Sequence, residues 1–201
     1  YVDPNRAAYL LGNASFQRKA DIAQRKSIVL LQNKMTLPLS IPKEGDSLKV
    51  FTMGIDPGKW SGRVKGVSGD YDTKKGEHLP AINKDTDYAI IRVYVTNDAG
   101  SNYRFGGALP EELNFLSFSS MAKSKSWKVT PSLQDIQAIM KILGPEKTIL
   151  SVDFRQPYVI DEASGLLNAG AILATFGVSD AAILDILTGK FSPSGKLPYA
   201  L

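Results

Sequence analysis

The stretch Tyr88-Ala-Ile-Ile-Arg-Val-Tyr-Val95 is nearly continuous in β-branched and aromatic residues. Such a run is typical of a strand buried on both faces of a parallel sheet, because a strand with one solvated face alternates apolar and polar residues. Working outward from it, apolar runs bounded by turn residues predict further strands over residues 48–53, 148–153 and 169–175.

Helical segments separate these strands along the chain. Pro131, with Ser132 in the first turn, opens a helix whose apolar stripe runs to Leu143 and ends at Gly144-Pro145. Ser179 is placed to cap a second apolar helix, which stops at Gly189. Because strands alternate with helices, we expect an α/β fold: a three-layer αβα sandwich around a mostly parallel sheet of about six strands.

The N-terminal region has a different pattern. Residues 5–27 predict helices, with Ser15 as the cap of the second one. An apolar run at residues 28–31 and the segment 37–39, where Pro38 suits an edge or a turn, predict a short extended ribbon outside the main sheet. We therefore expect residues 1–40 to form a linker, helices and a ribbon that pack on an α/β sandwich of residues 41–201, within one structural domain.

Composition narrows the class of protein. With 201 residues, 43% of them hydrophobic and 22% charged, the chain is long and apolar enough to fold around one core. The net charge of +4 is spread along the sequence, so we expect no nucleic-acid partner, and no apolar run is long enough to indicate a membrane partner. The absence of cysteine excludes disulfides and thiolate catalysis. His78 is the single histidine, and no phosphate-cradling motif occurs, so we expect neither a metal nor a cofactor.

Two long segments are interpreted as loops. Residues 54–69 are rich in glycine and contain Trp60. Residues 96–130 show no sustained period and are too long for a structureless connection in a compact domain, which indicates a functional loop or lid. Because ligands of open α/β sheets bind beyond the carboxyl ends of the strands, this second loop is where we expect the chemistry.

Three stretches carry a family resemblance. Residues 175–201 contain Pro193-Ser-Gly-Lys-Leu-Pro198, the run Arg25-Lys-Ser-Ile-Val-Leu-Leu-Gln-Asn33 precedes Leu37-Pro38-Leu39, and the chain opens with Tyr1-Val2-Asp3-Pro4. All three stretches resemble the second, C-terminal domain of glycoside hydrolase family 3. The run at residues 193–198 resembles a hallmark of that family, and the opening at residues 1–4 is similar to the linker that follows the family's first domain. The resemblance implies an α/β sandwich from a retaining, β-glucosidase-like exo-glycosidase. In such enzymes a barrel domain supplies the aspartate nucleophile, so we expect this chain to be inactive alone.

The resemblance also directs the search for site residues. The second domain often supplies the acid/base carboxylate, for which Glu111 and Glu112 are the candidates and Asp98 a weaker one. The alternatives are that the two glutamates form the exposed first turn of a helix and that Asp98 forms a turn. Trp60, flanked by glycines, resembles a tryptophan that stacks on a sugar ring at the pocket rim, and its alternative role is to anchor the loop to the core.

The expected partners are a carbohydrate substrate and the barrel domain of the same polypeptide. We expect the barrel-facing surface to expose apolar groups near Trp60, Tyr103 and Phe105 and to allow self-association. Export to the periplasm or medium is favoured by the resemblance. A non-catalytic domain that binds carbohydrate or supports the barrel is the rival hypothesis. A nucleotide-binding module ranks last, because residues 54–62 lack Gly-x-Gly-x-x-Gly.

Overall fold

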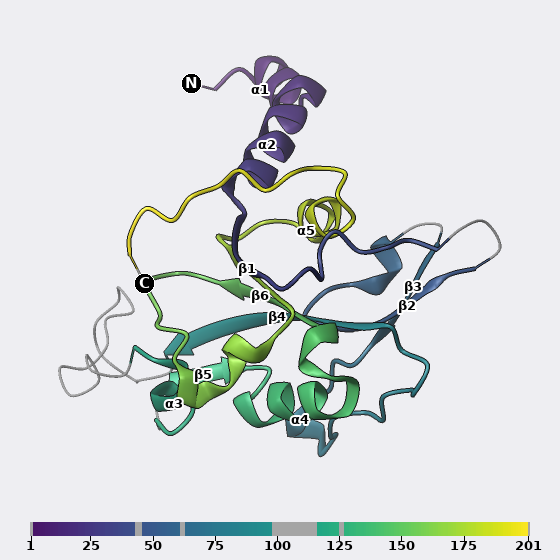
Figure 1. The fold of residues 1–201 in the computed structure, drawn as a ribbon. Helices are drawn as coiled ribbons and strands as arrows, with labels where there is room; N and C mark the ends of the chain where they lie inside the picture. The colour runs from purple at the N-terminus through teal and green to yellow at the C-terminus, as the bar shows by residue number, and fades with distance from the viewer. Residues whose placement is uncertain (1, 43–45, 61–62, 98–115, 125–126, 201) are drawn as a thin grey trace.

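A single mixed sheet organises the molecule (Figure 1). The computed structural model describes residues 2–42, 46–60, 63–97, 116–124 and 127–200. Within them the strand order is β1-β7-β6-β4-β2-β3, and β5 pairs with β4. The strands are β1 (Val29–Asn33), β2 (Leu48–Met53), β3 (Val64–Ser68), β4 (Tyr88–Asn97), β5 (Trp127–Thr130), β6 (Thr148–Asp153) and β7 (Ala171–Thr175).

The sheet is mostly parallel, as the sequence predicts. Strands β7, β6, β4, β2 and β3 run parallel, whereas β1 is antiparallel to β7 and β5 is antiparallel to β4. Strand β4 lies at the centre, where Ile91 pairs with Met53 on one side and with Leu150 on the other. Its Ile90, Ile91 and Val93 side chains are fully buried, so a continuous apolar run is what this position requires.

Helices cover both faces of the sheet. They are α1 (Pro4–Leu10), α2 (Ala14–Ser27), α3 (Phe118–Met121), α4 (Leu133–Leu143) and α5 (Asp180–Leu187). In Figure 1, α3 and α4 lie on one side of the sheet and α5 lies on the other. The apolar stripe of α4 packs in one core cluster with Val93, and that of α5 packs in a second cluster with Ile90. The three-layer αβα sandwich is therefore confirmed.

Caps define the helix ends. Ser179 caps α5, as predicted, with an Oγ that accepts from the N–H of Ala182. Ser132, which was expected in the first turn of a helix opened by Pro131, is instead the cap of α4, and its Oγ accepts from the N–H of Asp135. The predicted cap of α2 is wrong by two residues: Asn13 Oδ1 accepts from the N–H of Ser15, at 2.9 Å. Asparagine and serine both suit the N-cap position. Gly12, with a φ of 71°, makes the turn immediately before Asn13, so the helix begins earlier than expected.

The predicted ribbon outside the main sheet is wrong. Strand β1 pairs with β7 and forms an edge of the sheet, and residues 37–39 are not a strand. The turn after β1 is held by Asn33 Oδ1, which accepts the N–H groups of Thr36 and Leu37 at 3.0 Å each. The apolar run was therefore identified correctly, but its pairing partner is more than 130 residues away and cannot be found from local pattern.

Two strands lie in segments that the sequence indicates to be loops. Strand β3 contains Gly66 and lies at the edge of the sheet, and β5 has only four residues. Short edge strands carry weak periodicity, which explains why neither was expected.

The first two helices differ from the other elements. They stand at one end of the molecule in Figure 1, and none of their residues is buried. The last turn of α2 meets α5 through Arg25, whose Nε lies 2.7 Å from Asp185 Oδ2, and through Gln24, whose Oε1 accepts the N–H of Ser179 at 2.7 Å. Across the described part of the chain, no helix combines the length and apolar character that a membrane span needs.

Candidate functional site at the carboxyl edge of the sheet

The parallel strands end side by side and form the edge at which α/β sheets bind ligands. Strand β2 ends at Met53, β6 at Asp153 and β7 at Thr175. Strand β4 continues further: it pairs with β2 up to Ile91 and with β5 from Tyr94 on. A break in the sheet therefore lies where β2 stops and β5 begins.

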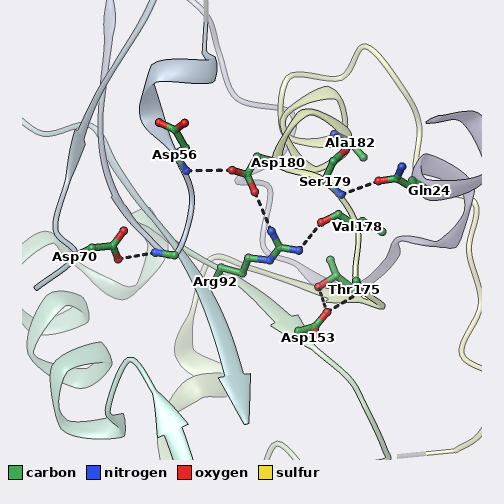
Figure 2. A network of polar contacts seen from close by, with 12 residues as sticks. Gln24, Asp56, Asp70, Arg92, Asp153, Thr175, Val178, Ser179, Asp180 and Ala182 are labelled. Carbon is green, nitrogen blue, oxygen red and sulfur yellow. Dashed lines mark hydrogen bonds and ion pairs between the residues drawn. The ribbon is translucent and has the colours of Figure 1, made fainter. Parts of the chain in front are cut away.

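Arg92 occupies the middle of this edge (Figure 2). It is 7% exposed, and its Nη1 donates to Asp180 Oδ1 at 2.8 Å while its Nη2 donates to the carbonyl of Val178. The guanidinium carbon lies 5.3 Å from the centre of the Tyr94 ring. Its Nε has no hydrogen-bond partner among the described residues. A buried charge with these partners ties β4 to the start of α5.

Asp180 extends this contact to the loop after β2. Its Oδ2 accepts the N–H of Asp56 at 3.1 Å, and Asp56 in turn caps the short 3-10 helix η1 (Pro57–Lys59). At the beginning of the same loop, Gly54 donates its N–H to Asp70 Oδ1 at 2.7 Å. Two carboxylates on different elements thus fix the backbone of this loop, as Figure 2 shows.

A second buried carboxylate lies at the end of β6. Asp153 is 8% exposed, and its Oδ1 accepts the N–H of Gly177 at 2.8 Å and approaches Thr175 Oγ1 at 3.5 Å. The contacts join the ends of β6 and β7. Since Asp153 uses a backbone donor, it rigidifies the turn after β7.

The break in the sheet opens into a cavity of about 390 Å³. Its lining combines carboxylate, hydroxyl, ammonium and aromatic groups from the ends of β2, β4 and β5 and from the loop after β3: Gly54, Asp70, Tyr71, Lys74, Arg92, Tyr94, Lys128 and Ser132 are among them. Aromatic faces beside hydrogen-bonding groups suit a ligand that is both apolar and rich in hydroxyls, as a sugar ring is.

The two tyrosines of this cavity are both held in the phenol form. The Tyr71 hydroxyl donates to Asp135 Oδ2 at 2.5 Å, and this hydrogen bond raises the pKa of Tyr71 to about 12. Burial raises the pKa of Tyr94, the Arg92 guanidinium opposes the rise, and nearby carboxylates such as Asp153 add to it. Both hydroxyls therefore remain protonated at neutral pH, and Tyr71 ties the loop after β3 to α4.

Trp60 lies in the core. It is 6% exposed and packs in the cluster under α5, and its Nε1 has no partner among the described residues. This geometry is that of an anchor for the loop, while contact with a sugar stays a prediction. Glu111, Glu112 and Asp98, like Tyr103 and Phe105, lie outside the described residues.

Of the other residues considered, Trp127 is buried and its ring meets Tyr158 edge-on, whereas His78 is exposed. The described residues contain no group of three or more His, Asp or Glu placed to hold a metal ion. Sequence reasoning missed Arg92, Asp153 and Asp180. The signal for Arg92 was present, because a charge inside an apolar buried strand requires a partner.

Comparison with known proteins identifies similar chains. Residues 28–201 match the profile described as the glycosyl hydrolase family 3 C-terminal domain. The whole chain is 28% identical to beta-glucosidase C of Emericella nidulans and 25% identical to a periplasmic beta-glucosidase/beta-xylosidase of Dickeya chrysanthemi. It spans 28% and 26% of the lengths of these two relatives.

Solved structures share the fold. A beta-glucosidase from Listeria innocua in complex with glucose superposes with a TM-score of 0.57 at 18% identity, over 96% of this chain and 28% of that one. A beta-glucosidase from Chaetomella raphigera gives a TM-score of 0.60 at 21% identity, over 92% of this chain and 30% of that one.

Proposed function

The chain belongs to the family of glycosyl hydrolase family 3 C-terminal domains. We therefore propose that the carboxyl edge of its sheet forms one wall of the sugar pocket in a β-glucosidase-like enzyme. The substrate class is a terminal β-linked sugar. The remainder of the polypeptide would supply the opposite wall as a barrel domain, consistent with relatives that are more than three times as long as this chain.

One observation carries the proposal: the cavity at the break in the sheet lies directly beside the strand that leads to Glu111 and Glu112. Tyr94, on β4, lines this cavity three residues before the strand ends at Asn97. Asp70 offers carboxylate oxygens and Lys128 an ammonium group to the same space. Sugar hydroxyls need both acceptors and donors, and this lining offers both.

The proposed chemistry divides two carboxyl groups between two domains. Retaining hydrolysis places a nucleophile and an acid/base about 5–5.5 Å apart on either side of the glycosidic bond. In our proposal the barrel provides the nucleophile, and Glu111 or Glu112 protonates the leaving oxygen, with Asp98 as the weaker candidate. General acid catalysis contributes about 10²–10⁴-fold in rate, which is of no use without the nucleophile. The isolated chain is therefore expected to release no glucose from an aryl β-glucoside.

The test uses the full-length enzyme that contains this chain. Glu111→Gln and Glu112→Gln are measured on a glucoside with a poor leaving group and on one with an activated leaving group. The acid/base variant is expected to lose about 10²–10⁴-fold on the poor leaving group. With the activated leaving group the glycosyl-enzyme still forms, but its hydrolysis is slowed because no base activates the water, and azide is expected to restore this turnover. Glu162→Gln, at an exposed position in the 3-10 helix η5 (Glu162–Ser164), is the matched control. Equal activity of all three variants would contradict the assignment.

A non-catalytic role is the second candidate, and the cavity favours it too, because its described lining offers hydrogen-bonding groups to a sugar without Glu111 or Glu112. In that case the glutamate variants keep their activity, while Tyr94→Ala raises KM and leaves kcat almost unchanged. Trp60→Phe tests the role of Trp60 in the same way. A sugar contact predicts a raised KM at unchanged stability, whereas an anchor predicts lowered stability at an unchanged KM.

A further inference from the structure

The N-terminal helix pair, α1 and α2, has a surface that its own domain does not use. Six of the thirteen large hydrophobic residues that are exposed in the described part of the chain lie between residues 2 and 22: Val2, Tyr9, Leu10, Leu11, Phe16 and Ile22. Tyr9 is 74% exposed and Leu11 is 77% exposed. The remaining seven are scattered over the rest of the molecule, so the concentration is specific to this pair.

The helices need a partner to be stable. Isolated helices shorter than about 12–15 residues are marginal in water, and most helical stability comes from burying an apolar face. Here α1 has 7 residues and α2 has 14, and neither buries any of them. The hydrogen bond and the ion pair that join them to α5 and its cap come from the last turn of α2, through Gln24 and Arg25.

Charge defines what the partner surface must offer. Residues 2–27 contain five basic and two acidic side chains. Arg6, Arg18, Lys19 and Lys26 are exposed, and none of them forms an ion pair with another described residue. A complementary surface is apolar with carboxylates at its rim. A second copy of this chain would bring the same basic residues face to face, which disfavours a symmetric dimer through this surface.

We propose that α1 and α2 form the docking surface for the remainder of the same polypeptide, through an apolar patch rimmed by acidic residues. The inference rests on the proposed function in one respect only, that this chain is one unit of a longer polypeptide. The matched relatives are long enough to contain a further domain that could dock here, since this chain spans only 26–28% of their length. The docking surface thus lies on the N-terminal helices and does not include Trp60, which is buried.

Hydrogen exchange tests the proposal directly. The amides of residues 14–27 are compared between the full-length polypeptide and the 201-residue chain. Docking predicts that they exchange at least about tenfold more slowly in the full-length protein, whereas the amides of α4 exchange at similar rates in both. Equal exchange of α2 in the two proteins would overturn the proposal.

A substitution gives an independent readout. Phe16→Ser is expected to lower the thermal midpoint of the full-length protein by several degrees and to leave that of the 201-residue chain unchanged. Ile142→Ser, at a position that is 59% exposed on α4, is the control and should change neither. Equal effects of Phe16→Ser and Ile142→Ser, or a dimer of the 201-residue chain that Phe16→Ser dissociates, would refute docking to the remainder of the polypeptide. Neither readout involves hydrolysis, so a failure here is distinct from a failure of the proposed function.

Discussion

Replacing Arg92 by methionine removes the charge at the centre of the carboxyl edge and keeps most of the aliphatic stem. The side chains of Arg92 and Asp180 are only 8% and 14% exposed, so their ion pair is largely desolvated. After the change, Asp180 Oδ2 still accepts the N–H of Asp56, and the carboxylate still lies at the positive end of α5. The opposite change, Asp180→Ala, leaves the guanidinium with the carbonyl of Val178 as its one remaining hydrogen-bond partner among the described residues, beside the Tyr94 ring.

The magnitude follows from these contacts. Arg92 makes two hydrogen bonds from a charged donor, each worth about 1.5–3 kcal/mol, and the methionine recovers part of the loss through packing. We expect Arg92→Met to cost about 3 kcal/mol and Asp180→Ala to cost more, up to about 5 kcal/mol, because a buried unpaired charge remains. For a chain of this size, about 3 kcal/mol corresponds to a fall of roughly 6–12 °C in the thermal midpoint.

Urea unfolding of each variant gives the free energy of unfolding and shows whether the m-value is unchanged. The double variant should cost less than the sum of the two single changes, because either substitution alone already breaks the pair. Lys49→Met breaks an exposed ion pair with Asp85 and should leave the urea midpoint unchanged. If Arg92→Met shifts the midpoint no more than Lys49→Met does, the reasoning about this buried pair is refuted.

Three further changes test other contacts. Tyr71→Phe removes the hydrogen bond to Asp135. Because the pKa of Tyr71 is raised from 10.0 to about 12 in the folded chain, this hydrogen bond stabilises the fold below pH 10 and stops doing so as the pH rises toward 12. Between pH 10 and 12 the variant should therefore lose less stability than the unmodified chain. Ser179→Ala removes the cap of α5 and should cost about 1 kcal/mol in urea unfolding. Gly69→Ala would place a methyl group 2.0 Å from Cζ of the buried Phe51 and should cost about 1–3 kcal/mol by the same measurement.

Two of these predictions have a control substitution in the same chain, and the third has an outcome that would contradict it. Ser192→Ala changes an exposed serine outside any helix, so a loss equal to that of Ser179→Ala would contradict the cap. Lys65 is an exposed residue of β3, the strand that ends just before Gly69. Equal losses of stability in Lys65→Ala and Gly69→Ala would therefore argue against the steric clash. For Tyr71, identical pH profiles of the variant and the unmodified chain would show that the hydrogen bond does not form.

Strands that are buried on both sides were the easiest to predict. The expected ranges 48–53 and 148–153 agree residue for residue with β2 and β6, since their apolar runs are bounded by polar or glycine residues. The expected strand at 169–175 starts two residues later, because Gly170 bonds to the turn before β6. Strand β1 shows the limit of the method: its residues were recognised, but its pairing with β7 depends on tertiary structure.

The candidate site was predictable only in its position. The carboxyl edge follows from the parallel order of the strands, but the side chains that meet there come from distant segments. Arg92, Asp153 and Asp180 lie together because β4, β6 and α5 are neighbours in space, and no spacing in the sequence encodes this. Glu111 and Glu112 remain predictions based on family resemblance.

The pairing of one side of β4 first with β2 and then with β5 has a consequence for how such a domain can diverge. Strand β5 attaches to β4 only beyond the point where β2 ends, and the five parallel strands keep their registers without it. Insertions or substitutions between β4 and β5 can therefore accumulate without changing the pairing of the five parallel strands. Under the proposed function, selection for a new sugar would act on that one connection while the scaffold, and with it the yield of folded protein, is inherited unchanged.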